Sequence, residues 1–469
     1  MSCLLSRPRP RPRPGAFPLI GAAIVLLLLG PLPALGTDDR VLVLISIDGL
    51  RPDLVLEAER HGLSLPQLRR LLAEGAHARA VEPVLPAVTY PNHTTLVTGV
   101  SPIQHGIHNN RSFDPTGRNR GGWNWYAEDI SVPTLWDVAE RAGLRTASVD
   151  WPVTVGAHIS YNIPQYWRAH TADDHKLLRA LTTPGLLAEA EAVLGPYPLG
   201  HDYSVAADGR RAAFAAYLLS KKRPRLLLLH LGSFDAVAHA HGPLDRHSLA
   251  VLEKLDGYIG TVRVAAERAS GGRAVIAVVS DHGFRPVWRT MHLNVALQEA
   301  GLITLGRGGQ VSSWRAYAWP SCGSAAIVLA DEQDRLARER VRALLERLAA
   351  DPTGGILRIM DGAEARRRGG FPQAAFVVIL RDGVEMGFRT SGPLFAQASG
   401  GTHGYAPDHP DMAAAFFVAG PGVPVGLDLG RIHMRDIAPT LAALLGLSLP
   451  APEGRGLFPV VAAAAAISN

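Results

Sequence analysis

The sequence predicts an α/β fold in which helices cover both faces of a doubly wound, mostly parallel sheet that carries an inserted cap region. Three features indicate this fold: apolar runs of strand length recur, stretches with helical periodicity separate them, and one long segment interrupts the alternation. Strands of parallel sheets are buried on both faces and therefore form unbroken apolar runs. Alternation of such strands with helices is typical of crossover units.

The elements can be followed in chain order from the first predicted strand, 41–47, which reads VLVLISI. The further predicted strands are 145–149, 225–231 and 274–280. Between them, apolar residues recur three or four positions apart, as on one face of a helix. This periodicity predicts four helices: 65–75, 134–143, 184–194 and 244–269.

Residues 290–400 do not continue the alternation. They contain an arginine-rich helical stretch at 332–350 and a predicted strand at 374–380, after which the α/β pattern resumes at 412–418 and ends with a helix at 436–445. We therefore expect 37–289 and 401–469 to form one α/β domain, the catalytic one if the protein is an enzyme, and 290–400 to form a cap.

The first 36 residues have the pattern of a secretory signal peptide. Four arginines precede an apolar run at 17–32, and small residues come just before position 37. This is the order of a cleaved signal, although an uncleaved anchor is an alternative. We expect an exported protein, periplasmic or secreted, with no later segment able to cross a bilayer.

Charge and cysteine content exclude some classes of protein. Four charges of the formal net charge of +5 come from arginines within 1–36, which leaves +1 for the rest of the chain. The overall charge therefore gives no argument for binding to polymeric nucleic acid, and we expect none. Only Cys322 remains after residue 36, so an internal disulfide is excluded.

Acids and histidines follow three of the predicted strands. They are Asp48 after 41–47, Asp235 and His239 after 225–231, and Asp281 and His282 after 274–280. Open α/β sheets bind ligands outside the carboxyl ends of their strands. We therefore expect these three acids and two histidines to converge at one edge of the sheet.

Each of these residues also has a plainer interpretation. Asp48 and its glycine neighbour could form a turn, and Asp235 and His239, four positions apart, could be a surface pair on a helix. It is harder to explain all five residues as turn or surface residues when they follow three strands of the same sheet. Carboxylate and imidazole ligands without thiolate suit zinc or another divalent transition metal. Five or six such ligands exceed one tetrahedral site and indicate a pair of metals.

The stretch PAVTYPNHTTLVTG at 86–99 contains four threonines and no obvious local base. Pro91 suits the first turn of a helix, so Thr89 is expected at a helix N-terminus, where anions are favoured. Threonine is a weak nucleophile unless a base or metal activates it, and a metal pair can do so. Thr89 is thus a candidate nucleophile. The other three are interpreted as helix and packing residues: Thr94, Thr95 and Thr98.

Six motifs of the chain jointly resemble the type I phosphodiesterase/nucleotide pyrophosphatase family of the alkaline phosphatase superfamily, with the character of a bacterial member. They are SIDGLRPD (46–53), TYPNHTTLVTG (89–99), HGIHNN (105–110), FDAVAHAHGP (234–243), SDHGF (280–284) and THGYAPDHPDM (402–412). Singly most are weak, but together they follow the family's order from 41 to about 445. The resemblance implies an alkaline-phosphatase-like fold that hydrolyses phosphodiester or phosphoanhydride bonds.

The resemblance also implies a role for each site residue. Thr89 would be the nucleophile, attached to phosphorus in a phosphothreonine intermediate, and Asn110 would donate a hydrogen bond to a phosphoryl oxygen. One zinc ion would be held by Asp48, Thr89, Asp281 and His282, and a second by Asp235, His239 and His403. Manganese or iron could replace zinc. Tyr90 and a downstream aromatic residue, Tyr166 or Trp167, would stack a nucleotide base, although ordinary loop packing is an equal alternative for the latter two.

Other superfamily activities are less consistent with the sequence. Sulfatases carry a Cys/Ser-x-Pro-x-Arg pattern that TYPNH at 89–93 lacks, and related threonine monoesterases carry a Lys-x-Arg pair that 148–152 lacks. A small phosphodiester or nucleotide is therefore the expected partner. A phosphomonoesterase, a phosphonate hydrolase and a phospho-headgroup transferase stay open as alternatives. A non-catalytic binding protein is less expected, because all seven predicted metal positions are filled.

Overall fold

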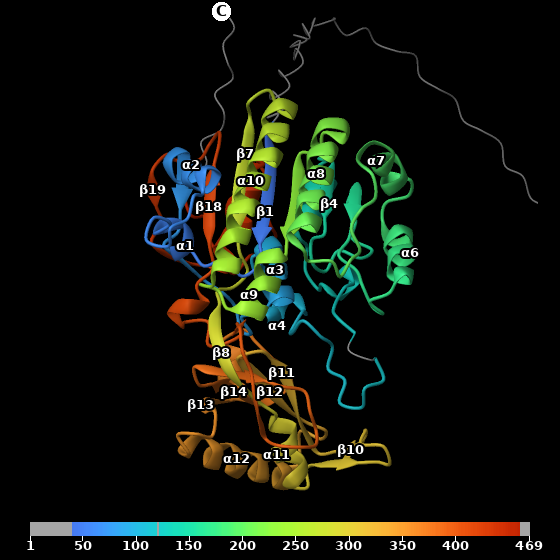
Figure 1. Ribbon diagram of the computed structural model, residues 1–469, viewed down its shortest axis with the longest axis vertical. Coiled ribbons are helices and arrows are strands. Elements are labelled where there is room, and N and C mark those ends of the chain that lie inside the picture. Colours follow the sequence, from blue (N-terminus) through green and yellow to red (C-terminus); the bar gives the residue numbers. More distant parts are fainter. Residues whose placement is uncertain (1–39, 120–121, 460–469) are drawn as a thin grey trace, which may run out of the picture. The chain divides into compact units, whose positions relative to one another are not determined.

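A computed structural model describes residues 40–119 and 122–459, and within them an eight-stranded sheet forms the centre (Figure 1). Its strand order is β19-β2-β18-β7-β1-β6-β4-β5. The strands are β1 Val41–Ile47, β2 Gly75–His77, β4 Thr146–Val149, β5 Tyr161–Ile163, β6 Leu226–Leu231, β7 Ala274–Val279, β18 Phe416–Ala419 and β19 Leu427–Asp428. The predicted α/β class is thereby confirmed, with a mixed and mostly parallel sheet.

The five strands β7, β1, β6, β4 and β5 run parallel, whereas β18 is antiparallel to both β7 and β2. In β1, Ile47 lies opposite Leu231 of β6, and Ser46 lies opposite Val279 of β7. The residues that follow these three strands therefore begin at one edge of the sheet. Strand β18 starts later than the predicted 412–418, and Pro410–Met412 forms a short 3-10 helix instead.

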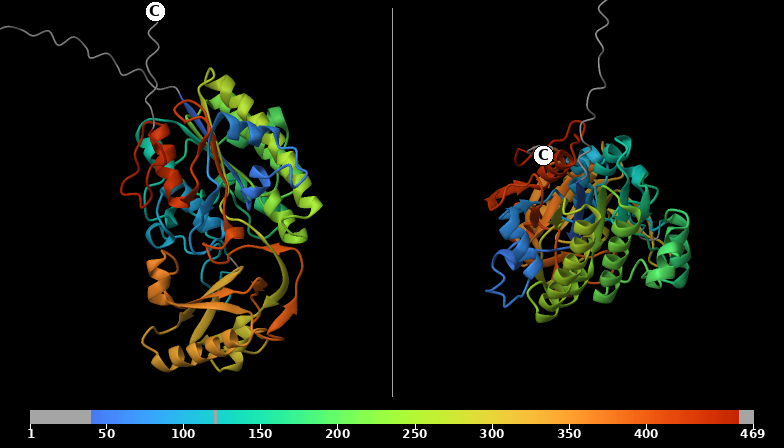
Figure 2. Two further views of the ribbon diagram at one scale, coloured as in Figure 1. Left: turned by 90° about the vertical axis from the view of Figure 1, so that its left-hand side faces the viewer. Right: turned by 90° about the horizontal axis from the view of Figure 1, so that it is seen from above.

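Helices cover both faces of the sheet, as predicted (Figure 2, left). On one face lie α2 Pro66–Glu74, α8 Val205–Lys222 and α10 Arg246–Ala269, and on the other lie α3 Thr89–Thr98, α5 Leu135–Arg141 and α14 Ile437–Leu444. Successive side chains of β1 point into opposite cores: Val43 and Ile45 into one, Leu42 and Leu44 into the other. This two-sided burial explains its unbroken apolar sequence.

Short helices and strands connect these layers. They are α1 Asp53–Leu56, α4 Pro102–His105, α6 Ala172–Leu181, α7 Leu186–Leu194, α9 Ser233–His241, and the pair β3 Ala80–Glu82 and β20 Arg431–His433. The sequence did not predict α8, one of the longest helices. Its apolar face is rich in alanine, so the hydrophobic periodicity is weak, but Ser204 caps its first turn by accepting from the Ala207 N–H.

A second, antiparallel sheet occupies much of 290–400. Its order is β11-β12-β14-β13, with bounds Ala316–Ser321, Ser324–Leu329, Ala374–Leu380 and Ile356–Asp361. Helix α12, Arg335–Ala350, packs on it; the helix begins three residues later than its predicted stretch because Asp334 caps it. Also present here are α11 Leu293–Glu299, β9 Ile303–Leu305, β10 Val311–Trp314 and α13 Gly362–Arg367.

The long strand β8, Arg285–Met291, links the two parts. It pairs with β15 Gly383–Met386, β16 Phe395–Gln397 and β17 Gly401–Thr402. The described residues pack as a single unit, so the division into 37–289 plus 401–469 and a cap at 290–400 stays a prediction.

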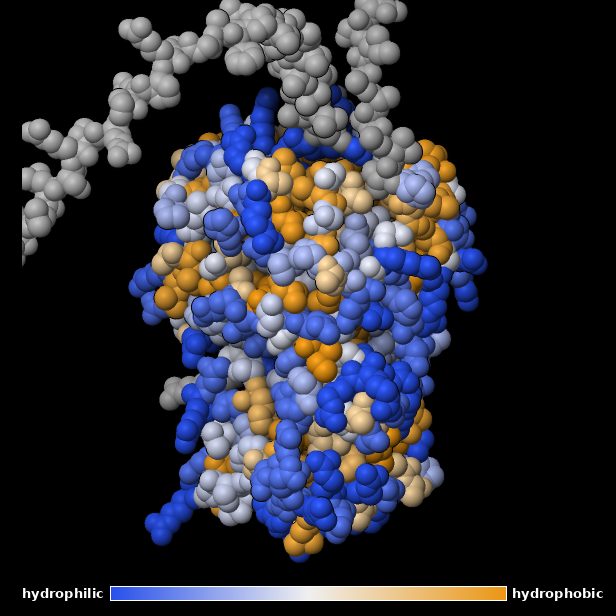
Figure 3. All heavy atoms as spheres, turned by 180° about the vertical axis from the view of Figure 1, so that it is seen from behind, coloured by the Kyte–Doolittle hydropathy of each residue, from blue (hydrophilic) through white to orange (hydrophobic). Residues whose placement is uncertain are grey.

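The predicted signal peptide, 1–36, lies outside the described residues. Among the helices that the structure describes, none combines the length and the apolar character needed to cross a membrane. On the face drawn in Figure 3, hydrophobic residues are interspersed with hydrophilic ones, as is normal for a folded domain.

Candidate active site

The ends of three parallel strands bring the predicted metal ligands together. Asp48 directly follows β1, Asp281 and His282 follow β7 after one serine, and α9 carries Asp235 and His239 on successive turns. Of three groups of described residues that could hold a metal ion, with ligand atoms that all lie within 4.8 Å of one another, two include these predicted ligands. These two groups are Asp235, His239 and His403, and Asp48, Asp235 and His282.

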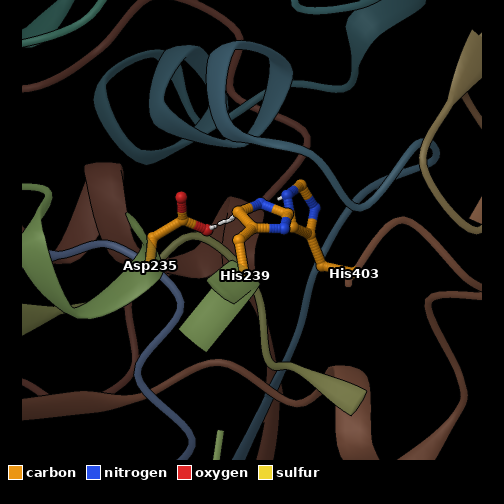
Figure 4. A group of neighbouring side chains, drawn as sticks. All are labelled: Asp235, His239 and His403. Atoms are coloured by element: carbon orange, nitrogen blue, oxygen red, sulfur yellow. Dashed lines mark ion pairs between the residues drawn. The ribbon is translucent and has the colours of Figure 1, made fainter. Parts of the chain in front are cut away.

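The first group is drawn in Figure 4, where the Asp235 carboxylate faces the two imidazoles. Asp235 Oδ1 lies 3.5 Å from His239 Nε2 and 3.9 Å from His403 Nε2. The Nδ1 atoms lie 3.0 Å from the Gly401 carbonyl and 3.1 Å from the Ala87 carbonyl, respectively. Because a carbonyl only accepts, both Nδ1 atoms carry the hydrogen, and both Nε2 atoms present a lone pair that suits a metal. Cys322 Sγ lies 3.9 Å from His403 Nε2.

The second group has the same design. His282 Nε2 lies 3.5 Å from Asp48 Oδ1 and 3.1 Å from Asp281 Oδ2, and its Nδ1 donates to the Gly283 carbonyl at 3.1 Å. Gly49 closes the turn after Asp48 with φ +76°, and its N–H donates to Asp281 Oδ1 at 3.1 Å. A Cβ at Gly49 would stand 2.9 Å from the Phe284 ring, so the turn requires glycine.

Several ligand-type atoms at this edge are buried without a hydrogen-bond partner among the described residues. They are Asp48 Oδ1, Asp235 Oδ1, Asp281 Oδ2 and His282 Nε2. Leaving such an atom unsatisfied costs about 1–3 kcal/mol, so four of them in one place need an explanation. Their chemistry fits two divalent cations, since carboxylate oxygen and imidazole nitrogen are the donors that zinc accepts.

The electrostatics of the site favour the same interpretation. Burial, and then the charge of Asp235, raises the pKa of Asp48 well above its ordinary value, and burial followed by Asp48 does the same to the pKa of Asp281. Burial lowers the pKa of His282 well below its ordinary value and that of His403 to about 3. The imidazoles are thus neutral, as metal ligation requires, and a cation would offset the cost of the buried carboxylates.

Thr89 is the first residue of α3, with Val88 as its N-cap. It lines a cavity of about 230 Å³ together with Asp48 and Asp235. The other threonine hydroxyls donate to backbone carbonyls: Thr94 to Tyr90, Thr95 to Val100 and Thr98 to Thr94. No hydrogen bond engages the Thr89 hydroxyl within the residues described, so it is available at the helix N-terminus.

Asn110 lies beside this N-terminus. Its Oδ1 accepts from the Tyr90 N–H at 2.8 Å. Because a backbone N–H can only donate, the carbonyl side of the amide is fixed toward α3, and Nδ2 is left as a donor. The neighbouring Asn109 anchors the loop by donating to the Pro320 carbonyl at 3.0 Å.

The predicted aromatic residues are placed differently from one another. Tyr90 and Trp167 line the Thr89 cavity together with Trp123, whose ring centroid lies 5.2 Å from that of each. The Tyr90 hydroxyl donates to Gln165 Oε1 at 2.6 Å. Tyr166 is not among the lining residues; its ring packs on Trp125 at 5.1 Å.

Sequence reasoning missed a buried network behind Asp48. His230 Nε2 lies 3.1 Å from Asp48 Oδ2, and its Nδ1 lies 3.3 Å from Asp150 Oδ2, which also lies 3.1 Å from Arg211 Nε. The sequence did contain a signal for this network. His230 interrupts the leucines of β6, and Asp150 follows β4 as Asp48 follows β1. Trp123 gave no signal, because its loop has no regular pattern.

Comparison with known proteins identifies relatives. A family model described as Type I phosphodiesterase / nucleotide pyrophosphatase matches residues 42–406. Human ectonucleotide pyrophosphatase/phosphodiesterase family member 1 is 24% identical over 261 residues, which cover 53% of this chain and 24% of that protein. Family member 7 from Rattus norvegicus is 23% identical over 439 residues, 90% of this chain and 86% of that protein. The chain thus spans about a quarter of the first relative and most of the second.

The fold has solved counterparts. A structure of murine ectonucleotide pyrophosphatase/phosphodiesterase 5, an inactive form in complex with AMP, superposes with a TM-score of 0.63 at 19% identity. The match covers 88% of this chain and 97% of that one. Because the family model extends over most of the described residues and over both candidate metal groups, the chain belongs to the type I phosphodiesterase/nucleotide pyrophosphatase family of the alkaline phosphatase superfamily.

Proposed function

We propose that the protein is an exported, metal-dependent phosphodiesterase or nucleotide pyrophosphatase that hydrolyses its substrate through a phosphothreonine on Thr89. One observation carries the proposal. The available Thr89 hydroxyl, at the N-terminus of α3, shares its cavity with Asp48 and Asp235, both of which have a buried oxygen without a hydrogen-bond partner among the described residues.

The ligands divide into two sets. One Zn²⁺ ion is assigned to Asp48, Thr89, Asp281 and His282, and a second to Asp235, His239 and His403. When bound, two divalent cations supply the positive charge that favours an ionised threonine hydroxyl and a departing oxygen anion. The arrangement of His239 and His403 supports this division, because their Nδ1–H groups are tied to backbone carbonyls.

The chain's own groups then act in two displacements. In the first, Thr89 Oγ1 gives its proton to solvent and attacks phosphorus, the Thr89 O–P bond forms, and the bond to the leaving oxygen breaks with its electron pair. Asn110 Nδ2 donates to a non-bridging oxygen, where charge builds up in the transition state. In the second, water attacks phosphorus, and Thr89 leaves and recovers a proton. The products are a phosphomonoester and an alcohol or phosphate.

A nucleotide is the proposed retained group. Tyr90, Trp123 and Trp167 offer aromatic surface in the Thr89 cavity, and aromatic rings stack on planar bases. The murine protein of the same fold is described in complex with AMP, which supports a nucleotide here.

Two synthetic esters test the proposal. The purified, zinc-loaded protein is expected to hydrolyse bis-p-nitrophenyl phosphate faster than p-nitrophenyl phosphate, to lose both activities on chelation and to recover them when zinc is restored. A preference for the monoester would contradict the proposed class of reaction. No activity on either ester with two ions bound would favour a transferase or a binding protein.

Export is tested separately. If the signal pattern functions, protein recovered from outside the cytoplasm should lack residues 1–36 when its intact mass is measured. An intact N-terminus on protein held at the membrane would instead support the uncleaved anchor.

A further inference from the structure

His93 is a buried histidine that the proposed reaction does not use. It lies on α3, four residues after Thr89, and its side chain is fully buried. It belongs to neither of the two candidate metal groups at the sheet edge. A buried imidazole loses the hydrogen bonds of water and has to find partners within the protein. The partners of His93 include the nucleophile's own backbone and a predicted metal ligand.

Both ring nitrogens of His93 have neighbours, which come from three different parts of the fold. Nδ1 lies 2.9 Å from the carbonyl oxygen of Thr89 and 3.5 Å from Asp281 Oδ2. Nε2 lies 2.8 Å from the hydroxyl of Ser46, on β1 two residues before Asp48. The ring thus contacts the start of α3, the turn after β7 and the end of β1, which supply three of the proposed ligands of the first ion.

These neighbours determine which nitrogen carries a hydrogen. A carbonyl and a carboxylate oxygen only accept, so Nδ1 carries the hydrogen and donates to the Thr89 carbonyl. Asp281 Oδ2 has no hydrogen-bond partner among the described residues, and the same N–H group is close enough to attract its charge. A hydroxyl can donate, so Ser46 suits the lone pair that is left on Nε2.

Two neighbouring rings hold the imidazole of His93 in place. The Trp151 ring meets it edge to face, with centroids 5.1 Å apart and planes at 81°, and the His230 ring does so at 5.0 Å and 85°. Both neighbours are buried. Because a closely packed core leaves no room for the imidazole to turn over, its Nδ1–H group stays at the Thr89 carbonyl.

One N–H group therefore contacts both the nucleophile residue and a metal ligand. Thr89 and Asp281 are assigned to the same ion, and attack on phosphorus depends on where Thr89 Oγ1 lies relative to it. A misplacement of about 1 Å can lower a rate about 100-fold. The His93 N–H opposes movement of the α3 start away from the turn after β7, because such a movement would break a buried contact.

We propose that His93 is a positioning residue for the reaction, and that its Nδ1–H group holds the Thr89 backbone and the Asp281 carboxylate at a fixed separation. The inference rests on the proposed function and adds to it a residue that is assigned to neither substrate nor metal. Ordinary core packing is the competing explanation. Under core packing, the shape of the ring matters and the Nδ1–H group does not.

Three substitutions of His93 separate the hydrogen bond from the shape. Asparagine places its Nδ2 donor near the position of the histidine Nδ1, glutamine reaches the position of Nε2 instead, and phenylalanine keeps a ring without either nitrogen. His93→Asn should keep kcat for bis-p-nitrophenyl phosphate within about threefold of the wild type. His93→Gln and His93→Phe should lower kcat by about 10–100-fold with little change in KM. Wild-type activity in His93→Phe, or equal losses in His93→Asn and His93→Gln, would overturn the proposal.

Zinc affinity is a second readout, which does not depend on turnover. Without the Nδ1–H group, the Asp281 carboxylate is less firmly held. His93→Gln and His93→Phe should therefore bind zinc about tenfold more weakly in competition with a chelator dye, and His93→Asn should bind it like the wild type. An unchanged zinc affinity in His93→Gln and His93→Phe would overturn the proposed link to Asp281.

His105→Gln is the matched control. His105 is also buried and faces α3, with Nε2 3.1 Å from the Thr95 hydroxyl, and its Nδ1 accepts from the Ile107 N–H. Loss of these bonds should lower the Tm, while kcat and zinc affinity should match those of the wild type. Equal losses of kcat in His105→Gln and His93→Gln would support core packing and overturn the proposal.

The zinc-loaded wild type provides a test that does not require the His93 variants to fold. Nitrogen-15 spectra of histidine-labelled protein, in which Ser46→Ala identifies the His93 signals, should show the hydrogen of His93 on Nδ1. A hydrogen on Nε2 alone would overturn the proposal.

The outcomes separate the positioning residue from the proposed function. If the wild type hydrolyses the diester but the activities of the His93 variants follow ring shape, the positioning role is overturned and the proposed function stands. If the zinc-loaded wild type hydrolyses no phosphodiester, the proposed function fails, and the positioning role fails with it.

Discussion

The imidazole rings of His282 and His403 stack face to face, with centroids 3.6 Å apart and planes 9° from parallel. One ring comes from each candidate metal group. Two imidazolium rings could not lie this close in a buried site, and both pKa values are lowered, chiefly by burial. The stack therefore joins the two groups through neutral rings whose Nε2 atoms are free to bind metal.

Metal content gives the first prediction. The wild type should bind two zinc ions per chain, and chelation should lower its Tm, because the buried carboxylates of Asp48 and Asp281 and the half-buried one of Asp235 would lose their counter-charge. His239→Ala should reduce the content to about one ion. His158→Ala, in an exposed loop, is the control and should retain both. Elemental analysis and calorimetry measure these quantities, and two ions in His239→Ala with full activity would contradict the ligand assignment.

Asn110 gives the second prediction, which separates the role of its Nδ2 as a donor to phosphate from the role of its Oδ1 as the acceptor of the Tyr90 N–H. Asn110→Ala and Asn110→Asp should both lower kcat, by a factor on the order of 100 to 1,000, because each removes the Nδ2 donor. Aspartate keeps an oxygen to accept the Tyr90 N–H. Single-turnover measurements compare the two variants. If Asn110→Asp is as active as the wild type while Asn110→Ala is not, the hydrogen bond from the Tyr90 N–H matters and the Nδ2 donor does not.

His230 gives the third prediction. His230→Ala removes the ring that faces Asp48 Oδ2 and Asp150 Oδ2, so zinc affinity should fall by about 10–100-fold, as for other residues that orient a ligand. Competition with a chelator dye measures the Kd. Activity at saturating zinc should recover in part. An unchanged zinc affinity would mean that the network only supports the fold.

The fourth prediction concerns stability and pH at His105. Nδ1 of His105 accepts from the Ile107 N–H at 3.1 Å, and Nε2 lies 3.1 Å from the Thr95 hydroxyl. Burial, and then repulsion by His108, lowers the pKa of His105 to about 3, while the unfolded chain protonates near 6.5. Below that pH the unfolded state binds a proton that the folded state does not, so acid destabilises the protein.

Urea unfolding at several pH values checks this. Because of His105, the unfolding free energy should fall by about 1.4 kcal/mol for each pH unit of acidification between roughly pH 6.5 and 3. The unfolding free energy of His105→Asn should fall less steeply as the pH is lowered, and the difference in slope should equal this contribution. The exposed His158→Asn should match the wild type. Parallel pH curves for His105→Asn and the wild type would contradict the prediction.

The sheet edge was predictable from the sequence, since parallel strands end on the same side. Asp48, Asp281 and His282 follow buried strands directly, and their convergence is a consequence of register. Pro91 likewise indicated that Thr89 lies at a helix start, and α3 begins there. The fold class and the family are confirmed, while the roles of the individual site residues stay predictions.

Other features depend on packing that the sequence pattern does not encode. Tyr166 and Trp167 are adjacent, yet only Trp167 lines the Thr89 cavity, because their side chains leave the loop in different directions. Arg111 and Arg389 are far apart in sequence and share a cavity through loop geometry alone. The spacing of residues in a loop predicts neither relationship.

The central claim is that Thr89 is the nucleophile, and turnover by Thr89→Ala tests it most directly. With zinc content checked and bis-p-nitrophenyl phosphate as substrate, the variant should lose activity by a factor on the order of 1,000 or more. Thr95→Ala, which alters a hydroxyl bonded to Val100, should retain it if the variant folds. The wild type quenched during turnover should carry a p-nitrophenyl phosphoryl group on Thr89 by mass spectrometry. Hydrolysis by Thr89→Ala at the wild-type rate would contradict the account.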